Sequence, residues 1–404
     1  MKKGWKEQFI TIYAGQAFSI LGSSVVQFAI IWWITMQTES AISLSFATIA
    51  AMLPTIFLGP IAGVYVDRID RKFILIASDL LVGLTSVVLA IAFTITPVPP
   101  LGLIYFMLFM RGVGNSFHGP AMQASIPMLV PKEMLTKAGA WGSLINSISN
   151  MAGPVLGAFL MGSFPIASIM WVDIVGALLA CFCLLFVKFS PLEIEDKEFS
   201  LLGDMKEGLQ ALTSSKQLRA MFPAAVLCNI IFNPIGSFLP LLVRTHFLGD
   251  AWHNSIVNFA AGAGILIASA IMGVWGGMKK RFLMIAWAIC GIGIMAISIS
   301  ILPPEAFWLF VAFSFIITGF TVFTNVPIMA YVQESVESHL LGKVLSLISS
   351  VLNVTMQLGL LIAGPLCEKL GVNQMFLISG ILMIGIGLVF RIATKQFDYP
   401  TEEV

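Results

Sequence analysis

Long apolar runs alternate with short polar stretches along almost the whole chain. Twelve runs approach or exceed the roughly 20 residues that a helix needs to cross the hydrocarbon core of a bilayer. We therefore expect an all-α integral membrane protein with twelve transmembrane helices, and an even number of spans places both termini on one side. The expected spans are residues 9–36, 42–66, 73–95, 101–125, 138–162, 166–188, 219–243, 255–277, 282–302, 306–331, 344–366 and 374–391.

One polar stretch is much longer than the others and divides the chain into two halves of six spans. Residues 1–188 form the first predicted bundle, residues 189–218 a cytoplasmic linker, and residues 219–404 the second bundle with a short cytoplasmic tail. Within the linker, residues 205–214 predict a short amphipathic helix that lies on the membrane surface.

The two halves share features of a repeat. The connection Gly63–Lys72 follows the second span, and its counterpart Gly273–Arg281 follows the eighth, where it keeps glycines and cations but lacks the acid. A glycine–proline pair occurs in the fifth span at Gly153 and in the eleventh at Gly364. Two six-helix pseudo-repeats are typical of secondary transporters, in which the substrate site lies between the halves.

Composition agrees with a membrane protein and argues against several other classes. The chain is 58% hydrophobic and 11% charged, whereas soluble domains have about 25% charged residues. The net charge of +1 gives no support for a nucleic-acid partner. The five cysteines and four histidines show no metal-ligand spacing, and the chain has no phosphate-binding glycine loop or hydrolase elbow. We expect no metal, no cofactor and no enzymatic activity.

Lysine and arginine are distributed unevenly between the two sides of the predicted membrane. Nineteen of the 22 fall on the side of the termini, whereas Arg244 and Lys369 fall on the other side and Arg111 lies within a span. Cytoplasmic loops are enriched in lysine and arginine. Both termini are therefore predicted to be cytoplasmic.

A six-residue, highly charged connection joins the second and third spans. So short a connection makes the two helices antiparallel neighbours. The pattern Gly-x-x-x-Asp-Arg-x-x-Arg-Lys resembles the signature loop of the major facilitator superfamily, although Asp70 stands where a second glycine is usual. The resemblance implies a cytoplasmic gate, and the alternative is a charge cluster that only orients the two helices. The residues concerned are Gly63, Asp67, Arg68, Asp70, Arg71 and Lys72.

Three ionisable residues fall within predicted spans. Arg111 is about ten residues into the fourth span, or ~15 Å deep, which is near the bilayer midplane. A guanidinium there must face a cavity, a carboxylate or carbonyl groups. The stretch Met110–Gly114 resembles the superfamily's fourth-span motif, which implies coupling to proton movement; a structural ion pair is the alternative. Asp79 and Asp173 are the candidate proton carriers, unless each merely anchors its helix near an interface.

The fifth span contains Gly153-Pro154-x-x-Gly157, which resembles the superfamily's antiporter motif. Ala140 and Ser149 stand where the fuller motif has glycines, so the match is partial. The resemblance implies a contact that keeps the closed state from leaking. The alternative is an ordinary helix that is kinked by proline and packed closely through its glycines.

Polar and aromatic residues recur in the first, fourth, seventh and tenth spans. Three prolines and a glycine in the seventh span predict a broken helix, whose irregular backbone is tolerated where it faces a cavity. In the superfamily these four spans line the central cavity, and such a lining suits a large, mostly apolar solute. The alternative for any one aromatic residue is that it faces lipid. The cavity candidates are Gln16, Gln27, Phe28, Trp32, Asn115, Asn229, Phe232, Asn233, Phe323 and Asn325.

Further stretches extend the resemblance over nearly the full length. They include Ala14–Ala17, Gly59–Val64, Phe117–Ala121 and Leu135–Lys137, which are similar to bacterial macrolide-efflux permeases of the drug:proton antiporter type. The resemblance implies a monomer in the bacterial cytoplasmic membrane that exports bulky, drug-like amphiphiles by alternating access. The proton gradient would be its energy source, with protons and the lipid bilayer as its other partners. Alternatives are an exporter of another bulky solute such as a siderophore, a proton-coupled nutrient importer, or a membrane scaffold or sensor that transports nothing.

Overall fold

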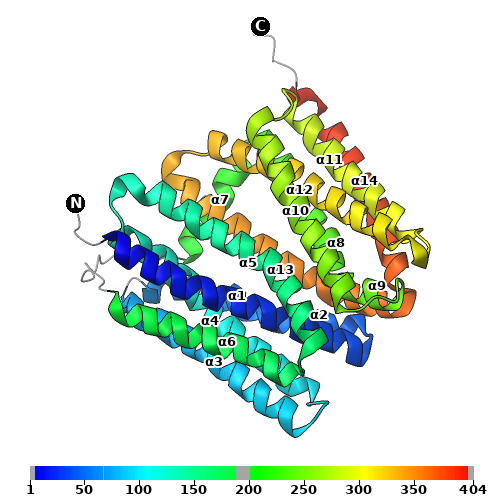
Figure 1. The fold of residues 1–404 in the computed structure, drawn as a ribbon. Helices are drawn as coiled ribbons and strands as arrows, with labels where there is room; N and C mark the ends of the chain where they lie inside the picture. Colours follow the sequence, from blue (N-terminus) through cyan, green and yellow to red (C-terminus); the bar gives the residue numbers. More distant parts are fainter. Residues whose placement is uncertain (1–4, 67, 188–200, 399–404) are drawn as a thin grey trace. The chain divides into compact units, whose positions relative to one another are not determined.

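The computed structural model describes residues 5–66, 68–187 and 201–398, and these residues form helices and connections without any strand (Figure 1). The helices belong to two compact units. Residues 1–39 and 46–187 lie in the first unit, except for those not described, and residues 201–249 and 256–398 lie in the second. Two short segments are grouped with the other unit: residues 40–45 with the second and residues 250–255 with the first.

The elements follow the predicted spans closely. The first unit contains α1 (Trp5–Thr38), α2 (Ala41–Val66), α3 (Arg71–Ile95), α4 (Leu101–Leu129), η1 (Lys132–Met134), α5 (Leu135–Ser163) and α6 (Ile166–Phe186). The second unit contains α7 (Leu201–Ser214), α8 (Lys216–Ser237), α9 (Leu239–Thr245), α10 (Ala251–Trp275), α11 (Arg281–Ser300), η2 (Pro304–Ala306), α12 (Phe307–Ser335), α13 (Ser338–Leu370), α14 (Val372–Thr394) and η3 (Lys395–Asp398).

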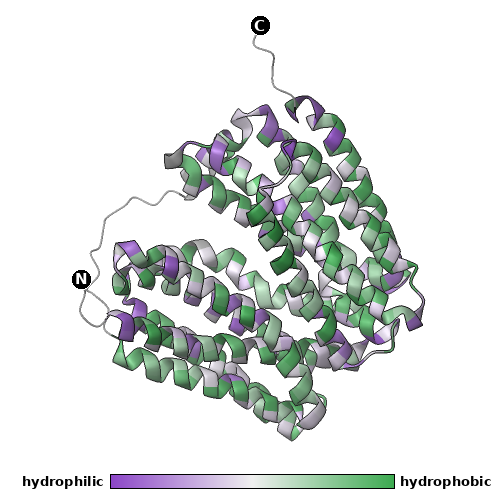
Figure 2. Cartoon of the chain, turned by 45° about the horizontal axis from the view of Figure 1, so that its top comes forward, coloured by the Kyte–Doolittle hydropathy of each residue, from purple (hydrophilic) through white to green (hydrophobic). Residues whose placement is uncertain are grey.

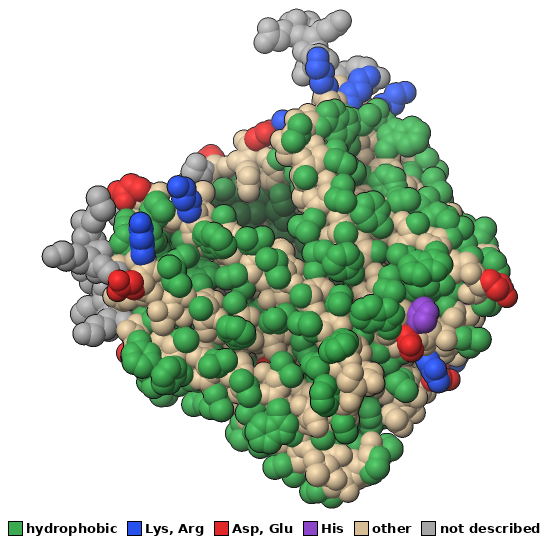
Figure 3. Space-filling view, in the orientation of Figure 1, with side chains coloured by type: hydrophobic (Ala, Val, Ile, Leu, Met, Phe, Trp, Pro, Cys, Tyr) green, Lys and Arg blue, Asp and Glu red, His purple; other side chains and the backbone are tan. Residues whose placement is uncertain are grey.

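Eleven helices of the described residues are long and apolar enough to cross a membrane. Apolar residues predominate along the helices (Figure 2), and hydrophobic side chains cover most of the face shown in Figure 3, as expected for surfaces that contact lipid. The 29-residue α4 has the length but is less apolar, because its middle contains Arg111, Asn115 and His118. Together with α4, these helices account for the twelve spans predicted from the sequence.

The two units repeat one packing pattern. In the first unit, α1 packs on α5 and α6, and α3 packs on α4 and α6. In the second unit, α8 packs on α13 and α14, and α11 packs on α12 and α14. Since α8, α11, α12, α13 and α14 take the places of α1, α3, α4, α5 and α6, the predicted pseudo-repeat is confirmed.

Glycines bring neighbouring helices close together in both units. A Cβ on Gly176 of α6 would lie 2.9 Å from the carbonyl oxygen of Phe18 in α1. A Cβ on Gly293 of α11 would lie 2.6 Å from the carbonyl oxygen of Gly380 in α14. Within a membrane, helices associate largely through such close backbone contact. The small residues at these points therefore let the helix backbones pack directly against each other.

The linker contains a helix where the sequence predicted one, and the seventh span is broken as predicted. The position of the linker helix on the membrane surface stays a prediction. The amphipathic segment predicted at 205–214 forms part of α7, which packs on α13 and α8, while residues 188–200 of the linker lie outside the described residues. The seventh span is broken, because α8 ends at Ser237 and α9 begins at Leu239, with Pro240 in its first turn.

The first turns of the equivalent helices α3 and α11 are capped in different ways. Asp70 precedes α3 directly, and its side chain accepts a hydrogen bond from the backbone N–H of Lys72 at 2.8 Å. Lys280 precedes α11 and provides no side-chain cap. Instead, Asp398 of η3 accepts hydrogen bonds from the backbone N–H groups of Phe282 and Leu283, each at 3.0 Å, and pairs with Arg391. The acid that is absent from the second loop is thus supplied from elsewhere in the chain.

Candidate functional site

Arg111 lies in the middle of α4 and is paired within the first unit. Its residue is 4% exposed, and its Nη1 donates to Oδ2 of Asp173 at 2.5 Å and to Oγ of Ser86 at 2.8 Å. Asp173 on α6 is fully buried and also accepts hydrogen bonds from Ser23 at 2.7 Å and from Ser86 at 2.6 Å. Both charges of this buried pair therefore have hydrogen-bond partners from neighbouring helices, which a charge in an apolar interior requires.

Small residues on both sides of this pair allow the helices to meet. A Cβ on Gly112 would lie 2.3 Å from the carbonyl oxygen of Ala51, and a Cβ on Gly114 would lie 3.2 Å from the carbonyl oxygen of Ser78. On α1, a Cβ at Gly22 would lie 3.2 Å from the Cα of Asp173. The glycines of the fourth-span motif thus let α4 approach α2 and α3, which brings Arg111 within reach of α6.

Asp79 on α3 forms a second buried polar cluster. Its carboxylate accepts hydrogen bonds from Nε2 of Gln16 and Oγ of Ser19, each at 3.0 Å. The Nε2 atom of His118 lies 2.7 Å from Oε1 of Gln16 and 3.7 Å from Oδ1 of Asp79. Since Gln16 donates to Asp79 through its nitrogen, its oxygen is the acceptor for a proton on His118 Nε2. The side chain of His118 is 17% exposed and that of Asp79 4%.

The two clusters form two layers that share α1, α3 and α4, and α6 adds Asp173 to one of them. Gln16 and Ser23 on α1, Asp79 and Ser86 on α3, and His118 and Arg111 on α4 are each seven residues apart. Seven residues are about two helical turns, or ~10 Å along a helix. We call the group of Gln16, Ser19, Asp79 and His118 the lower layer, and the group of Ser23, Ser86, Arg111 and Asp173 the upper layer.

The structure pairs Arg111 with Asp173 and places Asp79 in a separate buried layer, and it adds residues that the sequence analysis missed. His118, Ser19, Ser23 and Ser86 complete the two layers. A signal for His118 and Ser86 was available, because each lies seven residues from a predicted charged residue on the same helix face. Ser19 and Ser23 carry no such signal, since serine is common in the spans of this chain.

The residues of the charged loop tie helix ends together within the first unit. Lys72 donates through Nζ to the carbonyl oxygens of Leu185 and Val187 at 2.9 and 3.1 Å, at the end of α6. Arg71 donates to the carbonyl oxygens of Val66 at 3.4 Å and Ala124 at 3.2 Å. Cations at the carboxyl end of a helix are favourable because its last carbonyl groups lack partners.

The other members of the loop motif are placed differently. Asp70 caps α3, Arg68 is exposed, and nothing lies within 4 Å of a Cβ built on Gly63. Asp67 lies outside the described residues. The gating role of the motif stays a prediction.

The antiporter-type motif of α5 contacts α1. A Cβ on Gly153 would lie 2.1 Å from Oγ of Ser24, and a Cβ on Gly157 would lie 2.8 Å from the ring of Phe28. Pro154 is buried within α5. Because neither glycine has a side chain, α5 can pack directly against α1.

The predicted cavity residues are spread over both units. In the first unit Gln16, Phe28 and Trp32 are buried, Gln27 is half-buried and Asn115 is exposed. In the second unit Asn229 of α8 donates to the carbonyl oxygen of Leu352 on α13 at 2.6 Å. The remaining candidates are Asn233, which contacts Asn229, Phe323, which packs on Trp275, half-buried Phe232 and exposed Asn325. A common cavity lining stays a prediction.

Comparisons with known proteins agree over nearly the whole chain. The family described as transmembrane secretion effector matches residues 5–402. Macrolide efflux protein A of Streptococcus pyogenes is 34% identical over 387 residues, which cover 95% of each chain. Macrolide efflux protein A of Enterococcus faecalis is 32% identical over 323 residues, which cover 80% of this chain and 99% of the relative.

A solved structure shows the same fold at low sequence identity. The crystal structure of a bacterial homologue of the iron transporter ferroportin, in an inward-facing state, matches with a TM-score of 0.71 and 14% identity. The match covers 97% of this chain and 98% of that one. Repeated helix packing, apolar spans and the family match together lead to one conclusion: the chain is a multi-pass membrane transporter and belongs to the transmembrane secretion effector family of the major facilitator superfamily.

Proposed function

We propose that the protein exports bulky amphiphilic compounds of the macrolide type across the bacterial cytoplasmic membrane, in exchange for protons. Relatives that are 34% and 32% identical carry the name macrolide efflux protein, which supports the substrate class and the direction. The observation that carries the proposal is the pair of buried layers, because charges within a membrane protein are costly and mark ion or proton pathways. The protein binds substrate and proton alternately during the transport cycle.

The two acids have different partners, and this assigns them different roles. Asp79 is held by the neutral groups of Gln16 and Ser19, so a proton can neutralise it without stranding a buried cation. Asp173 faces Arg111 at 2.5 Å. Neutralising Asp173 would leave the guanidinium without its counter-charge, which costs several kcal/mol in an apolar interior. Asp79 is therefore the proton carrier, and Asp173 is the fixed counter-ion of Arg111.

His118 connects the carrier to its surroundings. It lies 3.7 Å from Asp79, and it is the more exposed of the two side chains. Histidine gains and loses a proton near neutral pH more readily than any other side chain. His118 thus passes the proton to and from Asp79.

Protonation of Asp79 changes how α1 is held. Hydrogen bonds to an ionised acceptor are about twice as strong as those to a neutral one. Loss of the charge therefore weakens the bonds from Gln16 and Ser19, both of which belong to α1. The same face of α1 carries Ser23 of the upper layer. Protonation of the lower layer therefore weakens the contacts of α1, which contributes residues to both layers.

The test is to replace Asp79 by Asn in vesicles that contain the purified protein. We expect Asp79→Asn to abolish uphill, proton-driven export of erythromycin while retaining downhill exchange of labelled for unlabelled drug. Glu305→Gln, at an exposed acid of η2, is the matched control and should leave both activities unchanged. Proton-driven export by Asp79→Asn at the wild-type rate would overturn the assignment of the carrier.

The substrate class and the direction are tested in cells. Expression in a pump-deficient bacterium should lower its susceptibility to macrolides, and a protonophore should restore susceptibility. In vesicles, drug addition should move protons in the direction opposite to the drug. Protons that move with the drug would indicate an importer instead, and the absence of any drug-dependent flux would contradict transport of this class.

A further inference from the structure

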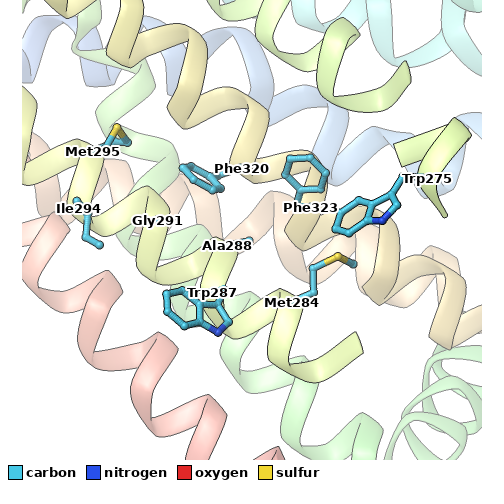
Figure 4. A pocket seen from close by; sticks show the side chains of 9 residues that line it. All are labelled: Trp275, Met284, Trp287, Ala288, Gly291, Ile294, Met295, Phe320 and Phe323. Carbon is cyan, nitrogen blue, oxygen red and sulfur yellow. The ribbon is translucent and has the colours of Figure 1, made fainter. Parts of the chain in front are cut away.

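An apolar groove lies on the second unit between α10, α11 and α12. Its volume is about 350 Å³, and it is open on one side. Figure 4 shows its lining side chains in succession along α11 and across to Trp275 and the two phenylalanines of α12. The lining residues are Trp275, Met284, Trp287, Ala288, Gly291, Ile294, Met295, Phe320 and Phe323.

The absence of a side chain at Gly291 shapes the middle of the groove. A Cβ there would lie 2.8 Å from the ring of Phe320, so the ring lies directly against the α11 backbone. Nearer the end of α10, Trp275 meets Phe323 edge to face, with ring centroids 6.4 Å apart. The floor and one end of the groove are therefore flat aromatic surfaces, and Met284 and Met295 add flexible side chains that fit irregular apolar shapes.

The position of the groove indicates what enters it. The three helices that form it are apolar enough to cross a membrane. Its lining residues Trp275, Trp287 and Ile294 are 54%, 65% and 50% exposed, and an exposed apolar surface on such helices suits contact with hydrocarbon. From Met284 to Met295 it follows eleven residues of α11, or ~16 Å. That length is about half of the ~30 Å hydrocarbon core, which is the depth of one leaflet. An apolar groove of this length fits a single acyl chain.

Cations gather at the end of the groove that lies near Trp275 and Met284. Gly276 and Gly277, with φ of +73° and +85°, turn the chain directly after Trp275. The next residues are Met278, Lys279, Lys280 and Arg281. Arg281 is paired with Glu334 at 2.5 Å. The side chains of Lys279 and Lys280 are exposed. In the sequence, both lysines lie between the groove residues Trp275 and Met284.

We propose that the groove and this loop together bind an anionic phospholipid, with one acyl chain in the groove and the phosphate at Lys279 and Lys280. The two parts are independent observations, since the groove selects an apolar chain and the loop selects a negative headgroup. The site belongs to the leaflet that faces the loop. It uses none of the residues of the polar layers and does not depend on which compound is transported.

Native mass spectrometry of the detergent-purified protein tests the site. The probes are phosphatidylglycerol and phosphatidylcholine with identical acyl chains. Wild-type protein should bind phosphatidylglycerol more tightly. Lys279→Gln with Lys280→Gln should remove this preference, at about fivefold in affinity for each lysine. Ile294→Trp, at a half-exposed groove position, should weaken both lipids by a similar factor because it fills the groove.

The control is Lys206→Gln with Lys216→Gln, which removes two exposed cations outside the groove and loop. It should keep the headgroup preference of the wild-type protein, and each variant should elute as the wild-type protein does in size exclusion. Equal binding of the two lipids by the wild-type protein would overturn the proposal. The same holds if the control loses the preference to the same extent as the loop variant, or if Ile294→Trp changes neither affinity.

Discussion

The two units share one helix-packing pattern but differ in what they bury at its centre. The first unit holds two ionic layers in the middle of α1, α3, α4 and α6. In the second unit, each described Asp, Glu, Lys, Arg or His within α8 and α10 to α14 lies in the first or last six residues of its helix. The buried polar residues of its helices are uncharged, such as Asn229 of α8, which donates to the carbonyl oxygen of Leu352 on α13. The fold therefore does not need the ionic layers.

This difference separates the glycine-mediated and apolar contacts, which both units need for packing, from the buried charges, which only the first unit has at the middle of its helices. Buried ion pairs can often be replaced by apolar residues of similar size without loss of stability. The second unit shows an arrangement of this kind within the same chain. The charges of the first unit are therefore not required by the packing alone, which agrees with the proton-coupling role proposed above.

The largest effect is expected from breaking the upper layer. Arg111→Ala should abolish export and lower the free energy of unfolding by about 3–5 kcal/mol, because it leaves Asp173 buried without a partner. The double variant Arg111→Met with Asp173→Leu should regain most of this stability but no export. Drug export and thermal unfolding of the purified variants are the measurements. Wild-type export by either variant would show that the layer serves packing alone.

A smaller effect is expected from His118→Gln in the lower layer. Glutamine can donate a hydrogen bond to Gln16 but cannot gain or lose a proton, so we expect export to fall about a hundredfold. The export rate should also depend less on pH than it does in the wild-type protein. His253→Gln, at the exposed start of α10, is the control. A wild-type pH profile in His118→Gln would remove this histidine from the proton path.

The smallest effects concern the caps of the equivalent helices α3 and α11. Asp398→Asn should lower the free energy of unfolding by about 1–3 kcal/mol, because it weakens two backbone hydrogen bonds and the pair with Arg391. Asp70→Asn should cost less, because Asp70 is exposed and asparagine also caps helices well. Neither change should alter the ratio of protons to drug. Equal thermal shifts for the two variants would contradict the difference between the caps.

Much of the fold was predictable because hydropathy adds up locally along the chain. Apolar runs predicted the spans, and the prolines around Phe238 predicted the break between α8 and α9. Arg111, Asp79 and Asp173 were recognisable because each is costly within an apolar span. The presence of the twelve spans therefore required no knowledge of which helices are neighbours.

The partners of these charges depend on helix rotation and pairing, which local patterns do not fix. His118 joins Asp79 only because α4 presents the same face as Arg111 two turns away. Asp398 caps α11 across 116 positions of sequence, and no periodicity relates the two. The apolar groove likewise required knowing that Phe320 lies against Gly291. Contacts between distant residues were the part that the sequence pattern left open.

The cap at Asp398 also has a consequence for biosynthesis. Chains are made from the amino end, and earlier segments begin to fold first. The first turn of α11 must therefore enter the membrane without its cap, and the ribosome adds more than a hundred further residues before Asp398 exists. Until then the free N–H groups of Phe282 and Leu283 have to be satisfied by water or headgroups at the bilayer surface. This cap of the second unit can therefore form only after residue 398 has been synthesised.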